Sequence, residues 1–474
     1  MSHSRRHFLR ALGGAAIGAG SFATISSALG GFQKAQAADV SGYKALVCVF
    51  LNGGMDHNDV IFPYDQPSYD EFARIRQTLL AGYKRGDPAF SRERAKLLPI
   101  NVANSGAFGG RQFALAPELK NIHAMFEAGN AAIIGNVGPL VEPVSKAGWK
   151  NGSATTPARL FSHNDQIASW MANKPEGAKH GWGGRFCDMV LSSGGNTRPE
   201  FSSLSTMTNQ LFSTGERTTP YQISTSGRTE IQMAMEFSNT ESEQAIMDHF
   251  RAVGYHPENL IQRDYVNIAE DSMDLNALFN DARENLVPLA TQFPDNQVGE
   301  QLKAVAETIA IRGTLLNARQ VFLVSMGGFD THSGQVFKLP RLMQELDAGI
   351  AAFYSALEEV GAARDVVTFT ASDFGRTLAV NGDGTDHGWG SHHFVVGGAV
   401  EGRTSYGDIP PPAFEHEQDA GHGRLIPTTS VEEFAEPLGR WFGLSAAEIE
   451  AVLPNLPNFR NNTASQGLKS LLVS

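Results

Sequence analysis

The chain has 474 residues, of which 42% are hydrophobic and 19% charged, and its formal net charge at pH 7 is −12. This is the composition of a globular protein with enough apolar residues for a large core. The acidic balance excludes nucleic acid as the main partner, because phosphate binding requires a basic stripe and none is present. The length suits two or three domains, or one large α/β domain.

Residues 1–37 have the pattern of a twin-arginine signal peptide. The motif SRRHFLR (residues 4–10) precedes a weakly apolar run of Ala, Gly and Ser, and AQA (residues 35–37) offers a signal peptidase two small residues. We therefore expect export of the folded chain by the twin-arginine translocase, cleavage by signal peptidase, and a periplasmic or secreted location. An N-terminal membrane anchor is the alternative, which the Gly and Ser content disfavours. No later segment is apolar enough to span a membrane, so we expect no stable span after cleavage.

The sequence has two cysteines, Cys48 and Cys187. An oxidising periplasm permits a disulfide between them. Cys48 lies inside the apolar run LVCVFL, which favours two buried thiols over a bridge. Two cysteines cannot form a cysteine-based zinc framework.

Short apolar runs of strand length predict a central sheet. They are rich in Val, Ile and Phe and do not alternate with polar residues, as expected of parallel strands covered on both faces. The runs are residues 45–51, 131–137, 320–326, 366–371 and 394–400. Helical patterns at residues 116–130 and 339–361 separate some of them. Strand–helix alternation predicts a doubly wound α/β fold with a mostly parallel sheet.

Two segments depart from this alternation. Residues 239–319 show helical periodicity with little strand pattern, which predicts a helical insertion or a set of covering helices, one of them begun or kinked by Pro288. Residues 196–226 are rich in Ser and Thr and are expected to be irregular, on the substrate side of the fold. We expect residues 38–474 to form a single domain.

Polar side chains gather where the predicted strands end. In doubly wound folds, sites form beyond the carboxyl ends of the strands. The polar residues at these ends are Asn52, Asp56, His57, Asn58, Asp59, Asp330, His332, Ser372, Asp373, Arg376, Asp383, Asp386, His387, His392 and His393. Carboxylates and imidazoles suit a divalent metal, and the histidines favour Zn²⁺ or Mn²⁺ over Mg²⁺ or Ca²⁺. The clustering predicts a metal site.

Each of these residues could instead have a structural role. Asp56 follows two glycines and could serve a turn. Asp330 could cap a helix that begins near Gly334, and Asp373 could also be a cap. His393 precedes an apolar run and is expected to be packed or exposed rather than to bind a metal.

A candidate nucleophile lies at the start of the amphipathic stretch 160–171. There, Ser162 and His163 would lie near backbone N–H groups and the positive end of a helix dipole, where a hydroxyl could attack an anionic ester. Ser162 could also be an ordinary N-cap. Arg185 could bind an anion through two hydrogen bonds or pair with an acid.

Several motifs together resemble the family known as domain of unknown function 1501. They are FLNGGMDHND, SHND followed by Trp, GWGGR, GGFDTHSGQ, SDFGRT and DHGWG followed by GGAV. They occur in family order over about residues 44–445. This family is grouped with the alkaline phosphatase and sulfatase superfamily, so the resemblance implies an α/β/α sandwich and a metal site that cleaves phosphate or sulfate esters.

The resemblance also implies functional residues. The implied metal ligands are Asp56 (or Asn52), Asp330, His332, Asp373 and His387, and the implied nucleophile is Ser162. The superfamily usually spaces its Asp and His by three residues, whereas only Thr331 separates them here. It often has His after the second Asp, where this chain has Phe374, and the family tends to carry Glu in place of Asp373. Because two imidazoles are missing, a site with two metals, one metal or none remains open.

The main hypothesis is a periplasmic or secreted metal-dependent hydrolase that acts on a small anionic phosphate or sulfate ester. Ser162 or a water activated by the cation would attack, with His163 and Arg376 as further catalytic residues. The alternative is a non-catalytic envelope binding or assembly protein that keeps the fold and binds a glycan or a partner. A secreted oxidoreductase is disfavoured, because the sequence has no G-x-G-x-x-G motif.

Overall fold

A computed structural model describes residues 38–208, 210–225, 245, 248–249, 252 and 259–473. The predicted signal peptide and much of residues 239–258 lie outside these described residues. Within them, a nine-stranded sheet forms the centre of the fold, and Ala38–Ser474 make one compact unit. The strand order is β11 (Ser405–Gly407), β5 (Ala131–Gly138), β10 (Ser391–Val396), β9 (Val366–Ser372), β1 (Lys44–Leu51), β8 (Arg319–Met326), β6 (Ser203–Ser205) and β7 (Tyr221–Gln222), with β12 (Thr429–Ser430) beside β5.

The middle of the sheet is parallel, as the sequence predicted. Strand β1 pairs in parallel with β8 on one side and β9 on the other. In this register Leu51 is level with Met326 and with Ser372, the last residues of the two neighbouring strands. The loops that follow β1, β8 and β9 therefore begin side by side at one edge of the sheet.

Strand β10 corrects the prediction for residues 394–400. The strand begins at Ser391 and ends at Val396, and it runs antiparallel to both β5 and β9. His392 and His393 are thus buried strand residues rather than loop residues. Because β10 runs antiparallel, the loop before it starts at the carboxyl edge of β9, which brings His387 to the same edge as the other loops.

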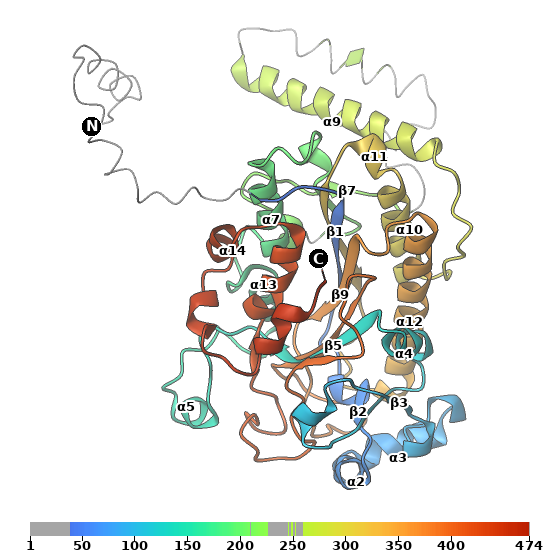
Figure 1. The fold of residues 1–474 in the computed structure, drawn as a ribbon, viewed down its shortest axis with the longest axis vertical. Helices are drawn as coiled ribbons and strands as arrows, with labels where there is room; N and C mark the ends of the chain where they lie inside the picture. The colour runs from blue at the N-terminus through green and yellow to red at the C-terminus, as the bar shows by residue number, and fades with distance from the viewer. Residues whose placement is uncertain are drawn as a thin grey trace, which may run out of the picture. The chain divides into compact units, whose positions relative to one another are not determined.

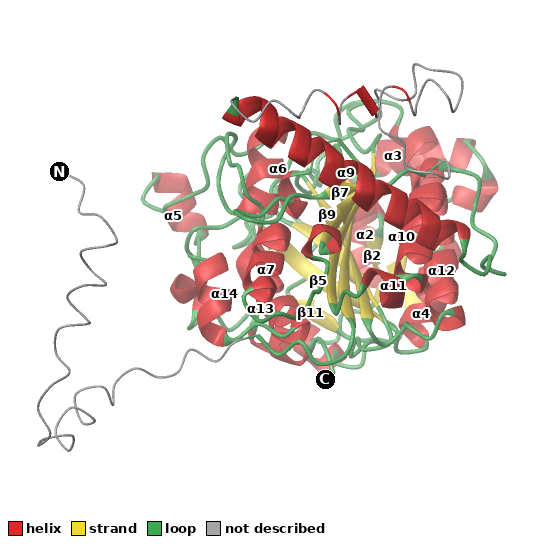
Figure 2. Ribbon diagram, turned by 90° about the horizontal axis from the view of Figure 1, so that it is seen from above, coloured by secondary structure: helices red, strands yellow, loops and turns green. Residues whose placement is uncertain are grey.

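Helices cover both faces of the sheet (Figures 1 and 2). One face carries α4 (Lys120–Glu127), α10 (Gln297–Ala310) and α12 (Gln335–Glu359); the other carries α7 (Trp182–Leu191), α13 (Val431–Phe442) and α14 (Ala446–Val452). A separate buried hydrophobic cluster lies on each face of the sheet, and alternate residues of β1 belong to different clusters. Val47 and Val49 belong to one, whereas Cys48 belongs to the other. The absence of polar alternation in β1 follows from this double coverage.

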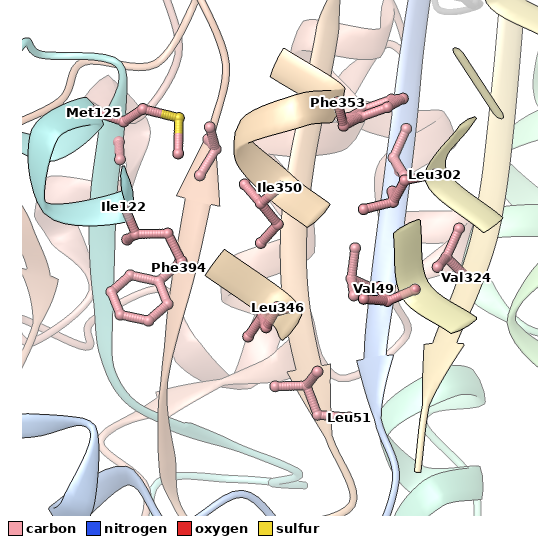
Figure 3. Close-up of a cluster of buried hydrophobic side chains, with 14 of the residues drawn as sticks. Val49, Leu51, Ile122, Met125, Leu302, Val324, Leu346, Ile350, Phe353 and Phe394 are labelled. Carbon is pink, nitrogen blue, oxygen red and sulfur yellow. The ribbon is translucent and has the colours of Figure 1, made fainter. Parts of the chain in front are cut away.

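Helix α12 supplies much of one core. Figure 3 shows Leu346, Ile350 and Phe353 of α12 beside Val49 and Leu51 of β1. All five side chains are at most 1% exposed. Truncating one such residue to Ala costs about 2–5 kcal/mol of stability, because a cavity is left behind. This packing holds α12 against the sheet, and the helix begins at Gln335, directly after a loop at the carboxyl edge of the sheet.

The segment predicted as a helical insertion contains α9 (Leu260–Glu284), α10 and α11 (Arg312–Leu315). Helix α10 packs in the main core through Val298, Leu302 and Val305, so it is a covering helix of the sandwich. The prediction for Pro288 was wrong, because this residue lies between α9 and α10, and α10 begins instead at an Asn296 cap.

Smaller elements complete the described fold. A three-stranded sheet is formed by β2 (Ile61–Pro63), β4 (Phe113–Leu115) and β3 (Leu98–Ile100). The remaining α-helices of the described residues are α2 (Gln66–Ile75), α3 (Gln77–Arg85), α5 (Lys146–Asn151) and α6 (His163–Ala172). The described part of residues 196–226 is mostly irregular, as predicted, but contains β6 and the edge strand β7.

Cys48 and Cys187 are free, buried thiols, as favoured from the sequence. Burial raises the pKa of both thiols, so they stay protonated and unreactive. Among the described residues, no helix has the length and apolar character needed to cross a membrane.

Candidate metal centre

Side chains from four segments meet at the carboxyl edge of the sheet. Asp330 follows β8, Asp373 follows β9, His387 lies in the loop before β10, and His163 is the first residue of α6. Nitrogen and oxygen atoms of His163, Asp330 and His387 all lie within 4.8 Å of one another, as potential ligands of one metal ion must.

Two of the imidazoles are oriented by an oxygen on their Nδ1 side. His163 Nδ1 lies 2.6 Å from Asp373 Oδ2, and Asp373 is itself buried and accepts a hydrogen bond from the backbone N–H of Gly53. His387 Nδ1 lies 2.8 Å from the carbonyl oxygen of Phe161. An acceptor at Nδ1 places the proton there and leaves Nε2 as a lone pair, the arrangement that second-shell acceptors give to metal-binding histidines.

The Nε2 atoms of three histidines converge on Asp330. His332 Nε2 and His387 Nε2 lie 3.2 and 3.3 Å from Asp330 Oδ1, and His163 Nε2 lies 3.6 Å from Oδ2. The two atoms His332 Nε2 and His387 Nε2 are 2.8 Å apart. Zinc ligands at 2.0–2.1 Å from the ion are about 3.3 Å apart in a tetrahedron. The spacings between the nitrogens and Asp330 suit a zinc-sized cation, whereas the 2.8 Å between the two nitrogens is a hydrogen-bond distance. Imidazole nitrogens and a carboxylate are also the donors that Zn²⁺ and similar divalent metals prefer.

Arg376 borders this cluster from the buried side. Its guanidinium is fully buried, donates to Thr385 and to the carbonyl of Gly53, and reaches Asp330 Oδ1 through Nη1 at 3.0 Å. Burial alone would raise the pKa of Asp330, but the hydrogen bond and charge of Arg376 outweigh it and hold that pKa below its usual value. Asp330 is therefore ionised at neutral pH.

The pKa values of His163 and His387 are shifted in opposite directions. The hydrogen bond to Asp373 raises the pKa of His163, against the opposing effect of burial. Burial lowers the pKa of His387, and the neighbouring charges of His163 and Arg376 add to this shift. A cation shared by the two rings therefore competes with a proton more strongly at His163 than at His387.

Asp56 does not join the cluster, although the resemblance assigned it to the metal. It is fully buried and ion-paired with Arg76 at 2.6 Å, and it also accepts from Gln335. Its Oδ1 accepts from the backbone N–H of Asn58, so Asp56 serves a turn, the structural role that its position after two glycines allowed. The side-chain amide of Asn52 donates a hydrogen bond to Ser325, so this residue also has a structural partner outside the cluster.

The hydroxyl of Ser162 is also committed. It donates to Asp165 Oδ2 at 2.9 Å, and the same carboxylate accepts from the backbone N–H of Glu176 as well. Ser162 occupies the N-cap position of α6, but its side chain makes no capping hydrogen bond. The structure thus gives this hydroxyl a structural partner and leaves His163, its neighbour, in the cluster.

Contacts also decide the roles of Asp330, His393 and Arg185. Gly334 rather than Asp330 precedes α12, and no side chain caps that helix. His393 is packed against Trp170, as expected of a packed histidine. Arg185 donates to the carbonyls of residues 451 and 452 and lies 3.8 Å from Glu216.

Sequence reasoning missed three features of the cluster. It placed His163 with the catalytic residues and did not group it with Asp330 and His387, it gave no individual role to Asp386, and it could not identify the carbonyl of Phe161 as a partner. Asp386 lies 3.2 Å from His332 Nδ1. The available signal for Asp386 was its position directly before His387 in the DHGWG motif.

The fold and the cluster define an α/β protein with a histidine-rich candidate metal centre at the carboxyl edge of a mostly parallel sheet. The chain belongs to the family described as Protein of unknown function (DUF1501), whose model matches residues 43–453. This confirms the resemblance drawn from the motifs.

No curated protein matches the sequence. Among solved structures, Ps i-CgsB in complex with k-i-k-neocarrahexaose has 10% identity and a TM-score of 0.34, covering 88% of this chain and 77% of that one. The C-terminal periplasmic domain of EcEptC from Escherichia coli has 8% identity and a TM-score of 0.34, covering 90% and 89%. A 2-O GAG sulfatase has 10% identity and a TM-score of 0.27, covering 85% and 71%. Scores this low do not identify a common fold.

Proposed function

We propose that this protein is an exported, metal-dependent hydrolase of a phosphate or sulfate ester, built on an alkaline phosphatase-like fold. The convergence of histidine Nε2 atoms on Asp330 is the observation that carries the proposal. A buried arginine beside that carboxylate supports it, because ester hydrolysis places negative charge on oxygens that a fixed cation can stabilise.

The residues of the chain would divide the work as follows. His163, Asp330 and His387 would hold a divalent cation, with Zn²⁺ or Mn²⁺ as the expected ions. When bound, such a cation acts as a Lewis acid on an ester oxygen and lowers the pKa of water. Asp373 holds the Nδ1 proton of His163 and so keeps its Nε2 directed at Asp330. Arg376 contributes positive charge that burial and Thr385 keep in place.

The test is turnover by the purified mature chain, residues 38–474. Chelator-treated protein should hydrolyse neither aryl phosphate nor aryl sulfate esters, and addition of Zn²⁺ or Mn²⁺ should restore one of the two activities. Asp330→Asn should abolish it, because the carboxylate shared by the cluster loses its charge. Asp383→Asn is the matched control, since Asp383 is an exposed acid that bonds the backbone of Gly334 and touches no histidine of the cluster. Metal-loaded wild type without turnover on either class would refute the proposal.

Export is the second part of the proposal, and it rests on the leader alone. Replacing Arg5 and Arg6 by Lys should retain the chain in the cytoplasm at its uncleaved size, because the twin-arginine pair is what the translocase recognises. Unchanged export of the double variant would show that another route is used.

A non-catalytic binding role is favoured by two observations. The hydroxyl of Ser162 is committed to Asp165. Phe374 stands where the superfamily often has His, and its ring packs 4.9 Å from that of His163 and 4.5 Å from that of His387. Under this second candidate function, the metal-loaded chain binds an anionic glycan, measurable by calorimetry, and Asp330→Asn abolishes binding although no bond is cleaved.

A further inference from the structure

His332 is the one imidazole of the cluster that lies in the same loop as Asp330, and a hairpin formed by residues 376–387 orients it. Its Nδ1 lies 3.2 Å from Asp386 Oδ1. Asp386 is itself held at both ends: Asn381 donates to its carboxylate at 2.7 Å, and Thr377 Oγ1 accepts from its backbone N–H at 3.1 Å. Although Asp386 is about half exposed, its carboxylate is thus fixed rather than free.

The hairpin and the loop that carries His332 are joined by several hydrogen bonds. The backbone N–H of Thr385 donates to the carbonyl of Thr331 at 3.1 Å, and Asp383 Oδ2 accepts from the backbone N–H of Gly334 at 2.9 Å. Between these bonds lies Gly384, where an added Cβ would lie 2.2 Å from the carbonyl oxygen of Thr331. Only glycine permits this approach, so the loop and the hairpin form one rigid unit.

This unit directs His332 Nε2 to where a metal ligand would lie. With the Nδ1 proton held by Asp386, Nε2 presents its lone pair to Asp330 and to His387, at 3.2 and 2.8 Å. His387 Nδ1 is occupied by a backbone carbonyl, so its Nε2 is also a lone pair. At 2.8 Å the two Nε2 atoms must share either a proton or a cation. A bound cation would take the place of that proton, which adds His332 to the group formed by His163, Asp330 and His387.

The charges around the cluster match a single divalent ion. Three acids surround the imidazoles, namely Asp330, Asp373 and Asp386, and Arg376 lies among them. With neutral imidazoles, the acids and the arginine leave an excess of two negative charges, which one divalent cation neutralises. Arg376 also donates to Asp330 Oδ1 from the buried side, where its guanidinium takes the place that a second ion on this carboxylate would need.

We propose that Asp386 makes His332 the fourth donor of a centre that binds one divalent cation through three imidazoles and one carboxylate. The ligands are His163, His332, His387 and Asp330. A nitrogen-rich set of this kind takes Zn²⁺, Co²⁺ or Ni²⁺ in preference to Mg²⁺ or Ca²⁺. The inference rests on the metal centre of the proposed function but does not require hydrolysis.

The experiment is a calorimetric titration of the chelator-treated mature chain with Zn²⁺ and with Co²⁺, together with visible absorption of the Co²⁺ form. Wild type should bind one equivalent. Asp386→Ala should weaken Zn²⁺ binding about 10–100-fold, the usual effect of removing a second-shell partner of a metal-bound histidine. It should also change the Co²⁺ spectrum, which reports the number and type of ligands.

Two further variants separate orientation from charge. Asp386→Asn removes the charge but keeps an oxygen acceptor for His332 Nδ1, so it should recover much of the affinity that Asp386→Ala loses. Asp383→Asn removes a charge from the same hairpin but keeps an oxygen acceptor for the backbone N–H of Gly334, so it should leave the affinity within about twofold of wild type. Equal losses of Zn²⁺ affinity in all three variants would show that only the negative charge of the hairpin matters, which would overturn the role of Asp386 in orienting His332.

A double-mutant cycle tests the ligand itself. His332→Ala should weaken binding at least as much as Asp386→Ala, and the double variant should bind no more weakly than His332→Ala, because Asp386 acts through His332. Two bound equivalents in wild type, or unchanged Zn²⁺ binding in His332→Ala, would refute the inference. Tight binding of one equivalent without ester turnover would instead refute only the proposed hydrolysis. Both residues are nearly half exposed, so the variants should fold.

Discussion

His163 Nδ1 lies 2.6 Å from Asp373 Oδ2, which is closer than the 3.2 Å between His332 and Asp386. Asp373 is 1% exposed, and its second oxygen accepts from the backbone N–H of Gly53. A fixed, buried carboxylate thus holds an imidazole that comes from another segment of the chain, at the N-terminus of α6. The contact joins the end of β9 to α6 and sets the orientation of one candidate ligand.

Asp373→Asn should lower the pKa of His163 in the metal-free protein. The raised pKa of His163 comes first from its hydrogen bond to Asp373, and an amide oxygen stabilises the imidazolium less than a carboxylate does. The measurement is a pH titration of the histidine ring signals by NMR, with Asp383→Asn as the control. An unchanged His163 titration would mean that other charges, rather than Asp373, stabilise the protonated ring.

Gly53→Ala should weaken metal binding about 10–100-fold, as other losses of ligand support do. Gly53 has a φ of +117°, and an added Cβ would lie 2.3 Å from the backbone nitrogen of Asp330, which must then move. Gly327→Ala is the control, because an added Cβ there meets nothing within 4 Å. Zinc titration of both variants measures the effect, and equal affinities would argue against a rigid placement of Asp330.

Asp56→Ala should destabilise the fold by about 3–5 kcal/mol while leaving the metal stoichiometry of the folded protein unchanged. Removing one partner of a buried ion pair leaves the other charge uncompensated, here the fully buried Arg76. Urea unfolding gives the first quantity, and elemental analysis of the folded fraction gives the second. Loss of metal without loss of stability would restore Asp56 to the ligand set that the resemblance implied.

Much of the fold could be predicted from the sequence because its strands are apolar on both faces. The runs at β1, β5, β8 and β9 match the structure within one residue at each end. The prediction failed at β10, because a strand that opens with Ser391, His392 and His393 does not look apolar, although all three are buried. Its antiparallel direction depends on its pairing with β9 and β5, which no local pattern encodes.

The candidate site was predictable in composition but not in roles. Residues at strand ends meet because parallel strands in register end together, so Asp330, His387 and Asp373 could be found. The sequence could not show that Asp56 lies apart from the cluster. Arg76 binds it from the end of α2, and only the tertiary fold brings these two residues together. The contact between His387 and the carbonyl of Phe161 could not be predicted either, because every residue has a backbone carbonyl and the residue type does not reveal its partner.

Acid should destabilise the metal-free protein in part through His57. This ring is 1% exposed, neither of its nitrogens has a hydrogen-bond partner, and burial, aided by the charge of Arg76, lowers its pKa to about 3. In the unfolded chain the pKa of histidine is about 6.5, so between pH 6.5 and 3 the unfolded state binds a proton that the folded state does not. The stability that depends on neutral His57 is therefore complete above pH 6.5 and is lost as the pH falls.

His57→Phe removes this titration and keeps an aromatic ring beside His392, whose centroid is 4.7 Å away. From pH 6 to pH 4 the free energy of unfolding should fall less steeply in the variant than in wild type. The difference between the two slopes should be about 1.4 kcal/mol per pH unit. Urea unfolding at several pH values with chelator present measures the slope, so a constant packing difference between His and Phe cancels. Above pH 7.5 the two stability curves should run parallel, because His57 is then neutral in both states. Equal slopes below pH 6 would mean that the folded protein accepts a proton on His57, which its burial opposes.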